Sequence, residues 1–299
     1  MRLLITALAL SSVLATTVAS ADASPSVALP AGFAHRTVTA NGQQLHVVIG
    51  GKGDPIVLIH GWPETWYEWN AVMPLLAATH TVIVPDLRGL GDSARAKTGF
   101  DKKTLAEDIY QLVHGLGFEK VMLVGHDWGA PVAYAYAANH RDAVTKLVMI
   151  EGAPFGPWTK ERAPYWFFGF QSIPDFAERV LAGHEREYLM WFYKNPDFGV
   201  LGDTAIEEYA RTYASPAGIK AGAELYRAIG QDIADNKDAQ KHPLEIPVLA
   251  IGAEHGNGAV VGTTMKLLAK HVTAIVIPKA AHFLPELQPE LVANKILAF

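Results

Sequence analysis

The stretch Val121–Ala137 reads VMLVGHDWGAPVAYAYA and restricts the fold more than any other part of the chain. An apolar run enters Gly125-His126-Asp127-Trp128-Gly129, and a second apolar run follows with no spacer. Small residues two positions to either side of Asp127 let a strand turn sharply into a helix, which exposes the central side chain at the edge of a sheet. The segment therefore predicts a strand–turn–helix unit that presents the Asp127 carboxylate as a nucleophile.

Short apolar runs rich in β-branched residues recur along the chain and predict strands that are buried on both faces. After a hairpin with its turn at Asn41-Gly42, they are 55–61, 81–89, 120–127, 146–152, 247–254 and 272–280. Helical patterns separate them, and in the clearest, 104–117, Thr104 and Glu107 have the spacing of a capping box. The alternation predicts an α/β protein with a mostly parallel, eight-stranded sheet and helices on both faces.

The alternation stops between residues 153 and 242, where aromatic and helix-forming residues predominate and strand patterns are missing. We expect a helical cap over 153–242, inserted between core segments at 30–152 and 243–299. Such a cap would lie over the carboxyl ends of the strands, where α/β sheets place their sites.

Residues 1–21 have the pattern of a secretory signal peptide: one charge at Arg2, an apolar segment, and the small residues Ala19-Ser20-Ala21. A membrane anchor is the alternative, but hydroxyl side chains dilute the apolar segment. We expect a periplasmic or secreted protein with no membrane span in its mature form. The net charge is −5 and the sequence has no basic stripe, so we do not expect the protein to bind nucleic acid. The lack of cysteine excludes thiol nucleophiles and Cys-ligated metals.

Three titratable residues follow predicted strands in the order expected for nucleophile, acid and base: Asp127, Glu151 and His282. Alone, a carboxylate at a strand end is often a helix cap, and a single His is more often a packed side chain. Together in this frame they predict a catalytic triad. Glu254, at the end of the strand 247–254, is the alternative orienting acid.

Two backbone N–H groups are expected to form an oxyanion hole: that of Trp62 in HGWPETWYEW, after a strand, and that of Trp128, next to the nucleophile. The turn DLRGLGDS, residues 86–93, is predicted to be structural, with Arg88 paired to Asp92. His184-Glu185 begins like a zinc-binding helix but lacks the second His, so we expect no metal and no other cofactor.

The core resembles the α/β-hydrolase fold, and HGWP together with GHDWG resembles its epoxide hydrolase and haloalkane dehalogenase branch. Several features resemble the secreted Cif-type epoxide hydrolases of bacteria. They are the leader, Glu151, the stretch AEHGNG with Gly256 where many relatives carry Asp, and the segments FAERVLAGHEREY and YASPAGIKAGAELYRA. The resemblance implies that Tyr226, before Arg227, gives a proton to the epoxide oxygen, and it aligns Trp166 with a second cap donor, usually Tyr or His. An indole N–H donates a hydrogen bond but cannot protonate an alkoxide. Both residues have a simpler alternative as packed cap side chains.

A carboxylate is already an anion at neutral pH, so it can attack a saturated carbon without a base. The alkyl ester that forms would then be hydrolysed by water activated by His282, with Glu151 behind it. Esters and amides would gain little from such a nucleophile. We therefore expect hydrolysis of small apolar epoxides to vicinal diols, with water as the second substrate.

Dehalogenation of haloalkanes or haloacetate by Asp127 is the alternative, with Trp128 and Trp166 as a halide cradle. Haloacetate dehalogenases hold the substrate carboxylate with arginines after the nucleophile, and this chain has Trp128 and Pro131 at those positions, which argues against haloacetate. The presence of Tyr226 argues against haloalkanes, because halide release from an alkane does not require a tyrosine. A non-catalytic binding or virulence module on the same fold is the remote alternative. A homodimer is expected for the assembly.

Overall fold

The computed structural model describes residues 27–161 and 165–299, so the predicted signal peptide lies outside the described residues. The centre of the molecule is one eight-stranded sheet in the order β1-β2-β4-β3-β5-β6-β7-β8. The first three strands in this order pair antiparallel and the rest pair parallel. The strands are β1 Phe33–Ala40, β2 Gln43–Gly51, β3 Asp54–Ile59, β4 His80–Pro85, β5 Val121–His126, β6 Val144–Ile150, β7 Leu244–Ala253 and β8 Ala269–Ile277. The predicted mostly parallel sheet of an α/β-hydrolase is confirmed.

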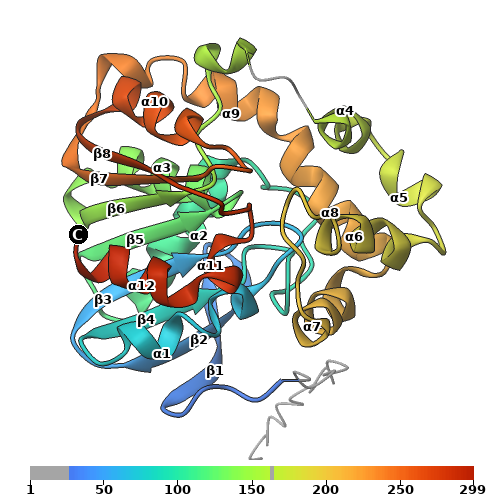
Figure 1. The fold of residues 1–299 in the computed structure, drawn as a ribbon, viewed down its shortest axis with the longest axis horizontal. Helices are drawn as coiled ribbons and strands as arrows, with labels where there is room; N and C mark the ends of the chain where they lie inside the picture. The colour runs from blue at the N-terminus through green and yellow to red at the C-terminus, as the bar shows by residue number, and fades with distance from the viewer. Residues whose placement is uncertain (1–26, 162–164) are drawn as a thin grey trace, which may run out of the picture.

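Helices cover both faces of the sheet (Figure 1). One face packs on α2 Lys102–Gly115, α3 Gly129–Asn139 and α10 Ala259–Leu268, and the other on α1 Met73–Leu76, α11 Leu284–Leu287 and α12 Pro289–Leu297. The short 3-10 helices are η1 Trp66–Trp69, η2 Arg141–Ala143, η3 Pro157–Glu161 and η4 Ala239–Lys241. The central strands are apolar along their whole length because side chains on both faces are buried.

Six further helices gather beyond one end of the strands (Figure 1) and are called the cap helices below. They are α4 Trp166–Ser172, α5 Ala177–Val180, α6 Glu185–Tyr193, α7 Asp203–Tyr213, α8 Pro216–Arg227 and α9 Ile229–Asp235. The boundaries expected for core and cap remain predictions. Within the described ranges, every helix is too short or too polar to cross a membrane.

Two local predictions were wrong. The helix expected from Thr104 begins at Lys102, and its cap is Asp101, whose Oδ1 accepts a hydrogen bond from the Thr104 N–H at 2.8 Å. Arg88 does not pair with Asp92: its Nη2 lies 2.6 Å from Asp108 Oδ1 on α2, where the pair is buried. Asp92 pairs instead with Arg211 of α7, which donates to both of its carboxylate oxygens.

Candidate active site

Asp127 lies in a strained turn between β5 and α3. Its φ is +45°, a left-handed conformation that costs a non-glycine residue on the order of 1 to 3 kcal/mol. The flanking glycines make the turn possible: a Cβ on Gly125 would lie 2.3 Å from the Gly129 carbonyl oxygen, and one on Gly129 would lie 2.1 Å from that of Ile59. The packing therefore explains why the sequence has small residues on both sides of the nucleophile.

The structure brings Asp127, Glu151 and His282 together. His282 Nε2 lies 3.5 Å from Asp127 Oδ2, and His282 Nδ1 lies 3.0 Å from Glu151 Oε2. Glu151 follows β6 directly, also at a positive φ of +50°, and is fully buried. The imidazole thus stands between the two carboxylates, in the arrangement that a nucleophile, base and orienting acid require.

Glu151, and not Glu254, contacts His282. The Glu151 carboxylate accepts hydrogen bonds from the N–H of Ala253 at 2.6 Å and of Asn257 at 2.8 Å. Glu254 instead accepts from the Lys279 N–H at 2.7 Å. A Cβ on Gly256 would lie only 2.0 Å from Glu151 Oε2, so the Glu151 carboxylate fills the space of a side chain at position 256.

The charges of the site are coupled. Burial opposes ionisation of Asp127, but the hydrogen bond and charge of His282, the charge of His126 and the Trp62 N–H together outweigh this effect and keep the pKa of Asp127 below its ordinary value. Burial alone would lower the pKa of His282, yet its bonds to Asp127 and Glu151 raise that pKa to about 9. At neutral pH the site holds an Asp127 carboxylate beside a protonated His282.

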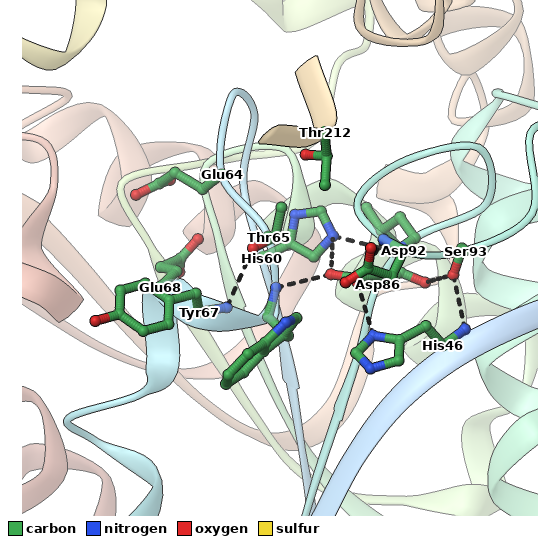
Figure 2. A network of polar contacts seen from close by, with 12 residues as sticks. His46, His60, Glu64, Thr65, Tyr67, Glu68, Asp86, Asp92, Ser93 and Thr212 are labelled. Carbon is green, nitrogen blue, oxygen red and sulfur yellow. Dashed lines mark hydrogen bonds and ion pairs between the residues drawn. The ribbon is translucent and has the colours of Figure 1, made fainter. Parts of the chain in front are cut away.

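The Trp62 N–H donates to Asp127 Oδ1 at 3.0 Å, and Trp128 directly follows Asp127 at the start of α3. The loop around Trp62 is held by the buried Asp86 carboxylate, shown with His46 and Ser93 in Figure 2. Asp86 accepts from His46 Nδ1 at 2.8 Å, from the Trp66 N–H at 2.8 Å and from the Asp92 N–H at 2.9 Å. The DLRGLGDS turn thus anchors the loop that carries Trp62.

Aromatic side chains enclose a pocket above Asp127. They are Trp62, Trp128, Phe155, Tyr165, Phe167, Phe168, Phe192, Phe198, Tyr226 and Phe283. Among the described residues that line this pocket, none is Lys or Arg. Tyr226 is buried, with its ring centroid 4.7 Å from that of Trp128. Burial raises the pKa of Tyr226 well above its ordinary value, so this phenol keeps its proton at neutral pH.

The structure does not place Trp166 in the pocket, and the prediction that it binds substrate was wrong. Its side chain is 54% exposed and packs on Trp191 and Phe170 at the outside of the cap helices. Helix α4 begins at Trp166, so its neighbours Tyr165 and Phe167 point into the pocket instead. Successive helical residues are about 100° apart, and an alignment wrong by one residue therefore selects the wrong face.

Sequence reasoning missed a buried cluster behind Asp127. His126 Nδ1 lies 3.3 Å from Glu64 Oε2 and 3.2 Å from Glu68 Oε1, and His126 Nε2 lies 2.9 Å from the His282 carbonyl oxygen. The His282 carbonyl oxygen only accepts, so His126 carries a proton on Nε2, and the two neighbouring glutamates favour a second proton on Nδ1. Burial lowers the pKa of His126, but the two glutamates raise it well above its ordinary value.

These three side chains could each offer a ligand atom to a metal ion, because the atoms lie within 4.8 Å of one another. The ion pairs of His126 with the two glutamates already account for this geometry. The two glutamates within HGWPETWYEW, acidic residues in an aromatic run, were the signal that could have revealed the cluster.

Comparison with known proteins gives a consistent result. A family model described as the alpha/beta hydrolase fold matches residues 54–289. A soluble epoxide hydrolase of Corynebacterium sp. (strain C12) is 36% identical over 276 residues, which cover 89% of this chain and 96% of that protein. A solved structure of the epoxide hydrolase CorEH without ligand has a TM-score of 0.82 at 36% identity, covering 89% of this chain and 98% of that one. A fluoroacetate dehalogenase of Burkholderia sp. is 31% identical over 217 residues, 67% of this chain and 70% of that protein.

Proposed function

The chain belongs to the α/β-hydrolase family, in its epoxide hydrolase branch, and on that premise we propose that Asp127 opens epoxides to vicinal diols through an ester on its own carboxylate. One observation carries the proposal: the anionic Asp127 lies at the base of an aromatic pocket, with His282 on one oxygen and the Trp62 N–H on the other.

In the first step an Asp127 oxygen attacks one ring carbon of the epoxide, and the bond from that carbon to the epoxide oxygen breaks. The electron pair goes to the epoxide oxygen, which takes the Tyr226 phenolic proton. Burial keeps this proton on Tyr226 until an alkoxide, a stronger base, develops. The products are a hydroxyalkyl ester of Asp127 and a Tyr226 phenolate.

In the second step the ester itself activates His282. Esterification removes the Asp127 charge that raises the pKa of His282, so the imidazole loses its proton. His282 then takes a proton from water, and the hydroxide adds to the ester carbonyl carbon. The Trp62 and Trp128 N–H groups stabilise the oxyanion, and collapse of the intermediate releases the diol oxygen, which is reprotonated by His282. The remaining water proton, on the carboxyl of Asp127, returns to Tyr226. His282 regains from solvent the proton that it released to solvent on esterification, because Asp127 is again an anion.

The pocket favours neutral substrates. Among its described lining residues the only cation is His282, which already lies between the Asp127 and Glu151 carboxylates, so a substrate carboxylate would be buried there without a free counter-charge. This argues against haloacetate as the main substrate, although dehalogenation by Asp127 is the second candidate because of the similarity to the fluoroacetate dehalogenase. Trp166 lies outside the pocket, so the two-indole halide cradle does not form.

Intact-protein mass spectrometry of His282→Gln tests the proposal. Without its base the enzyme should accumulate an adduct equal to one whole epoxide, mapped to Asp127, when it is incubated with styrene oxide. Adducts only from 1-bromobutane or fluoroacetate, with halide released, would instead support dehalogenation. Asp127→Ala is the matched control and should form no adduct while remaining folded.

We also propose export from the cytoplasm with cleavage after Ala21. The support is the pattern of residues 1–21 alone. Expression of the full chain in a bacterial host should give a periplasmic or secreted protein whose mass corresponds to a start at Asp22. Recovery of the uncleaved chain from the membrane fraction would contradict this proposal and support the anchor.

A further inference from the structure

Lys102, the first residue of α2, has a fully enclosed ammonium group. Its Nζ lies 2.9 Å from Asp232 Oδ2 and donates to the Leu225 carbonyl at 2.7 Å. The same nitrogen lies 4.4 Å from the centroid of the Trp128 ring. Lys102 and Asp232 are each only 2% exposed. Together with the Phe100 carbonyl, to which Nζ donates at 3.4 Å, these groups surround the buried charge with a carboxylate, two carbonyls and an aromatic face.

These partners belong to three different parts of the fold. Asp232 is on α9 and Leu225 on α8, both cap helices (Figure 1), whereas Trp128 directly follows the nucleophile. The Asp232 carboxylate also accepts from the backbone N–H of Lys102 at 2.8 Å. The ammonium thus ties the cap helices to the turn that holds Asp127.

The contact with α8 fixes the backbone next to Tyr226. Helix α8 ends at Arg227, so the Leu225 carbonyl is one of the last carbonyls of the helix, where a cation is favoured. The same peptide unit joins Leu225 to Tyr226. A bond from Lys102 to that carbonyl therefore sets where the Tyr226 side chain leaves the backbone.

The contact with Trp128 acts on Tyr226 from the other side. A cation over the face of an indole withdraws electron density and makes the indole N–H a stronger donor. The Trp128 and Tyr226 rings meet edge to face with their centroids 4.7 Å apart, and the influence of Trp128 on the phenol opposes the effect of burial on the pKa of Tyr226. The donor is thereby strengthened toward a phenolate that forms only during ring opening.

We propose that Lys102 is a positioning residue for ring opening: its ammonium, neutralised by Asp232, fixes the Tyr226 backbone through Leu225 and polarises Trp128 toward the Tyr226 oxygen. The inference rests on the proposed function of Tyr226 as the proton donor. It acts on formation of the Asp127 ester and leaves hydrolysis of that ester, which depends on His282 and Glu151, unchanged.

The test separates this role from a purely structural one. Lys102→Met leaves Asp232 buried without its partner and is expected to lower stability, so the double variant Lys102→Met/Asp232→Asn is made beside it to restore neutrality. Lys103→Met, which removes an exposed lysine from the next position, is the matched control. Rapid-quench mass spectrometry with styrene oxide measures ester formation and ester hydrolysis as separate rates.

We expect the double variant to be folded, with ester formation slowed about ten- to hundredfold, the range for loss of a charged hydrogen bond. Its ester hydrolysis should change by less than about twofold, and Lys103→Met should match the parent in both rates. In a Tyr226→Phe background, the same double substitution should slow ester formation by less than about threefold, because the group it positions is already lost.

Parent-like ester formation in the folded double variant would overturn the proposal. The proposal would also be overturned if the double substitution slowed ester formation in the Tyr226→Phe background as much as it does in the parent. Equal slowing of ester formation and ester hydrolysis in the double variant would overturn it as well. Parent-like ester formation in Tyr226→Phe alone would instead refute the proposed role of Tyr226, a result that is read independently of any Lys102 variant. If Lys102→Met does not fold, the rates of ester formation and ester hydrolysis are compared with the parent in Asp232→Asn and in the double variant.

Discussion

Glu151 and position 256 compete for one space beside His282. The Cβ that any residue other than glycine would have at 256 lies 2.0 Å from Glu151 Oε2, the oxygen that contacts His282. An Asp side chain at 256 could thus reach His282 once the Glu151 side chain is removed. The orienting acid can be supplied from either of two adjacent strand ends, but not from both.

Exchange of these residues tests this relation. Glu151→Gly should slow ester hydrolysis by a factor on the order of 10³, because His282 loses its orienting acid. Glu151→Gly/Gly256→Asp should recover at least about tenfold of that loss. Gly256→Asp alone should destabilise the protein, because two carboxylates would overlap. Single-turnover kinetics measure the recovery, and a double variant no faster than Glu151→Gly would show that position 256 cannot orient His282.

The charge of Asp127 controls the protonation of His282. In Asp127→Ala the pKa of His282 should fall from about 9 toward its ordinary 6.5, because the largest stabilising bond to the imidazolium is lost. An NMR pH titration of the His282 ring measures this fall, with Asp175→Ala as a remote control. A pKa that stays near 9 in Asp127→Ala would mean that esterification does not activate the base.

The sequence predicted the site residues that lie at the ends of strands. It did not predict the residues whose position depends on how helices pack together. Asp127, Glu151 and His282 each follow an apolar run, and the carboxyl ends of parallel strands must converge. Lys102 reaches Trp128 and Asp232 only because α2 packs against α9, which no local pattern announces. Trp166 was misplaced because the start of α4 sets which side chain faces inward.

At the scale of elements, two cap helices hold the loop that carries Trp62. The buried Tyr193 of α6 donates to the Pro63 carbonyl at 2.6 Å, and the buried Tyr213 of α7 donates to the Glu64 carbonyl at 2.6 Å. The loop between β3 and η1 is thus fixed from the core by Asp86 and from above by two phenols. The sequence showed the aromatic content of this region but not the partners of its hydroxyl groups.

Removal of these hydroxyls should loosen the oxyanion hole. Tyr193→Phe and Tyr213→Phe each leave a buried carbonyl unpaired, so each should lower the free energy of unfolding by about 1 to 3 kcal/mol. Ester hydrolysis should slow more than ester formation, because it depends on the Trp62 N–H. Tyr136→Phe is the control, since its buried hydroxyl has no hydrogen-bond partner in the described structure and its loss should be neutral or stabilising. Urea unfolding and single-turnover rates measure both effects, and Tyr136→Phe behaving like the cap variants would refute the explanation.

At the scale of the whole molecule, stability should decrease on the alkaline side. His282 has a folded pKa of about 9 against an ordinary 6.5, so its contribution is complete below pH 6.5 and is lost as the pH rises through 9. The size of the shift corresponds to about 3 kcal/mol. His126, whose pKa is also raised, acts in the same direction. Urea unfolding between pH 6 and 10 should show the decrease, and His282→Gln should flatten much of it; an unchanged slope in that variant would place the effect elsewhere.

The overall architecture was predictable because apolar runs of strand length alternate with helices, and few sheet orders accommodate such a chain. The hairpin at Asn41-Gly42 and all of the predicted parallel strands are present. What the sequence could not supply is how the cap helices contact the core, since those contacts join residues far apart in the chain, such as Lys102 and Asp232, which are 130 positions apart.

The position of Glu151 has a practical consequence for protein engineering. The nucleophile and its orienting acid both precede the cap helices in the chain and are separated only by α3, η2 and β6, whereas an acid at 256 would follow the cap helices. A chimera that receives a foreign lid between Glu151 and β7 therefore inherits an acid already in register with Asp127. Libraries that vary the length of this insert can be screened for new substrates without redesigning the relay, provided that the graft keeps a tyrosine in the place of Tyr226 and an aspartate for Lys102.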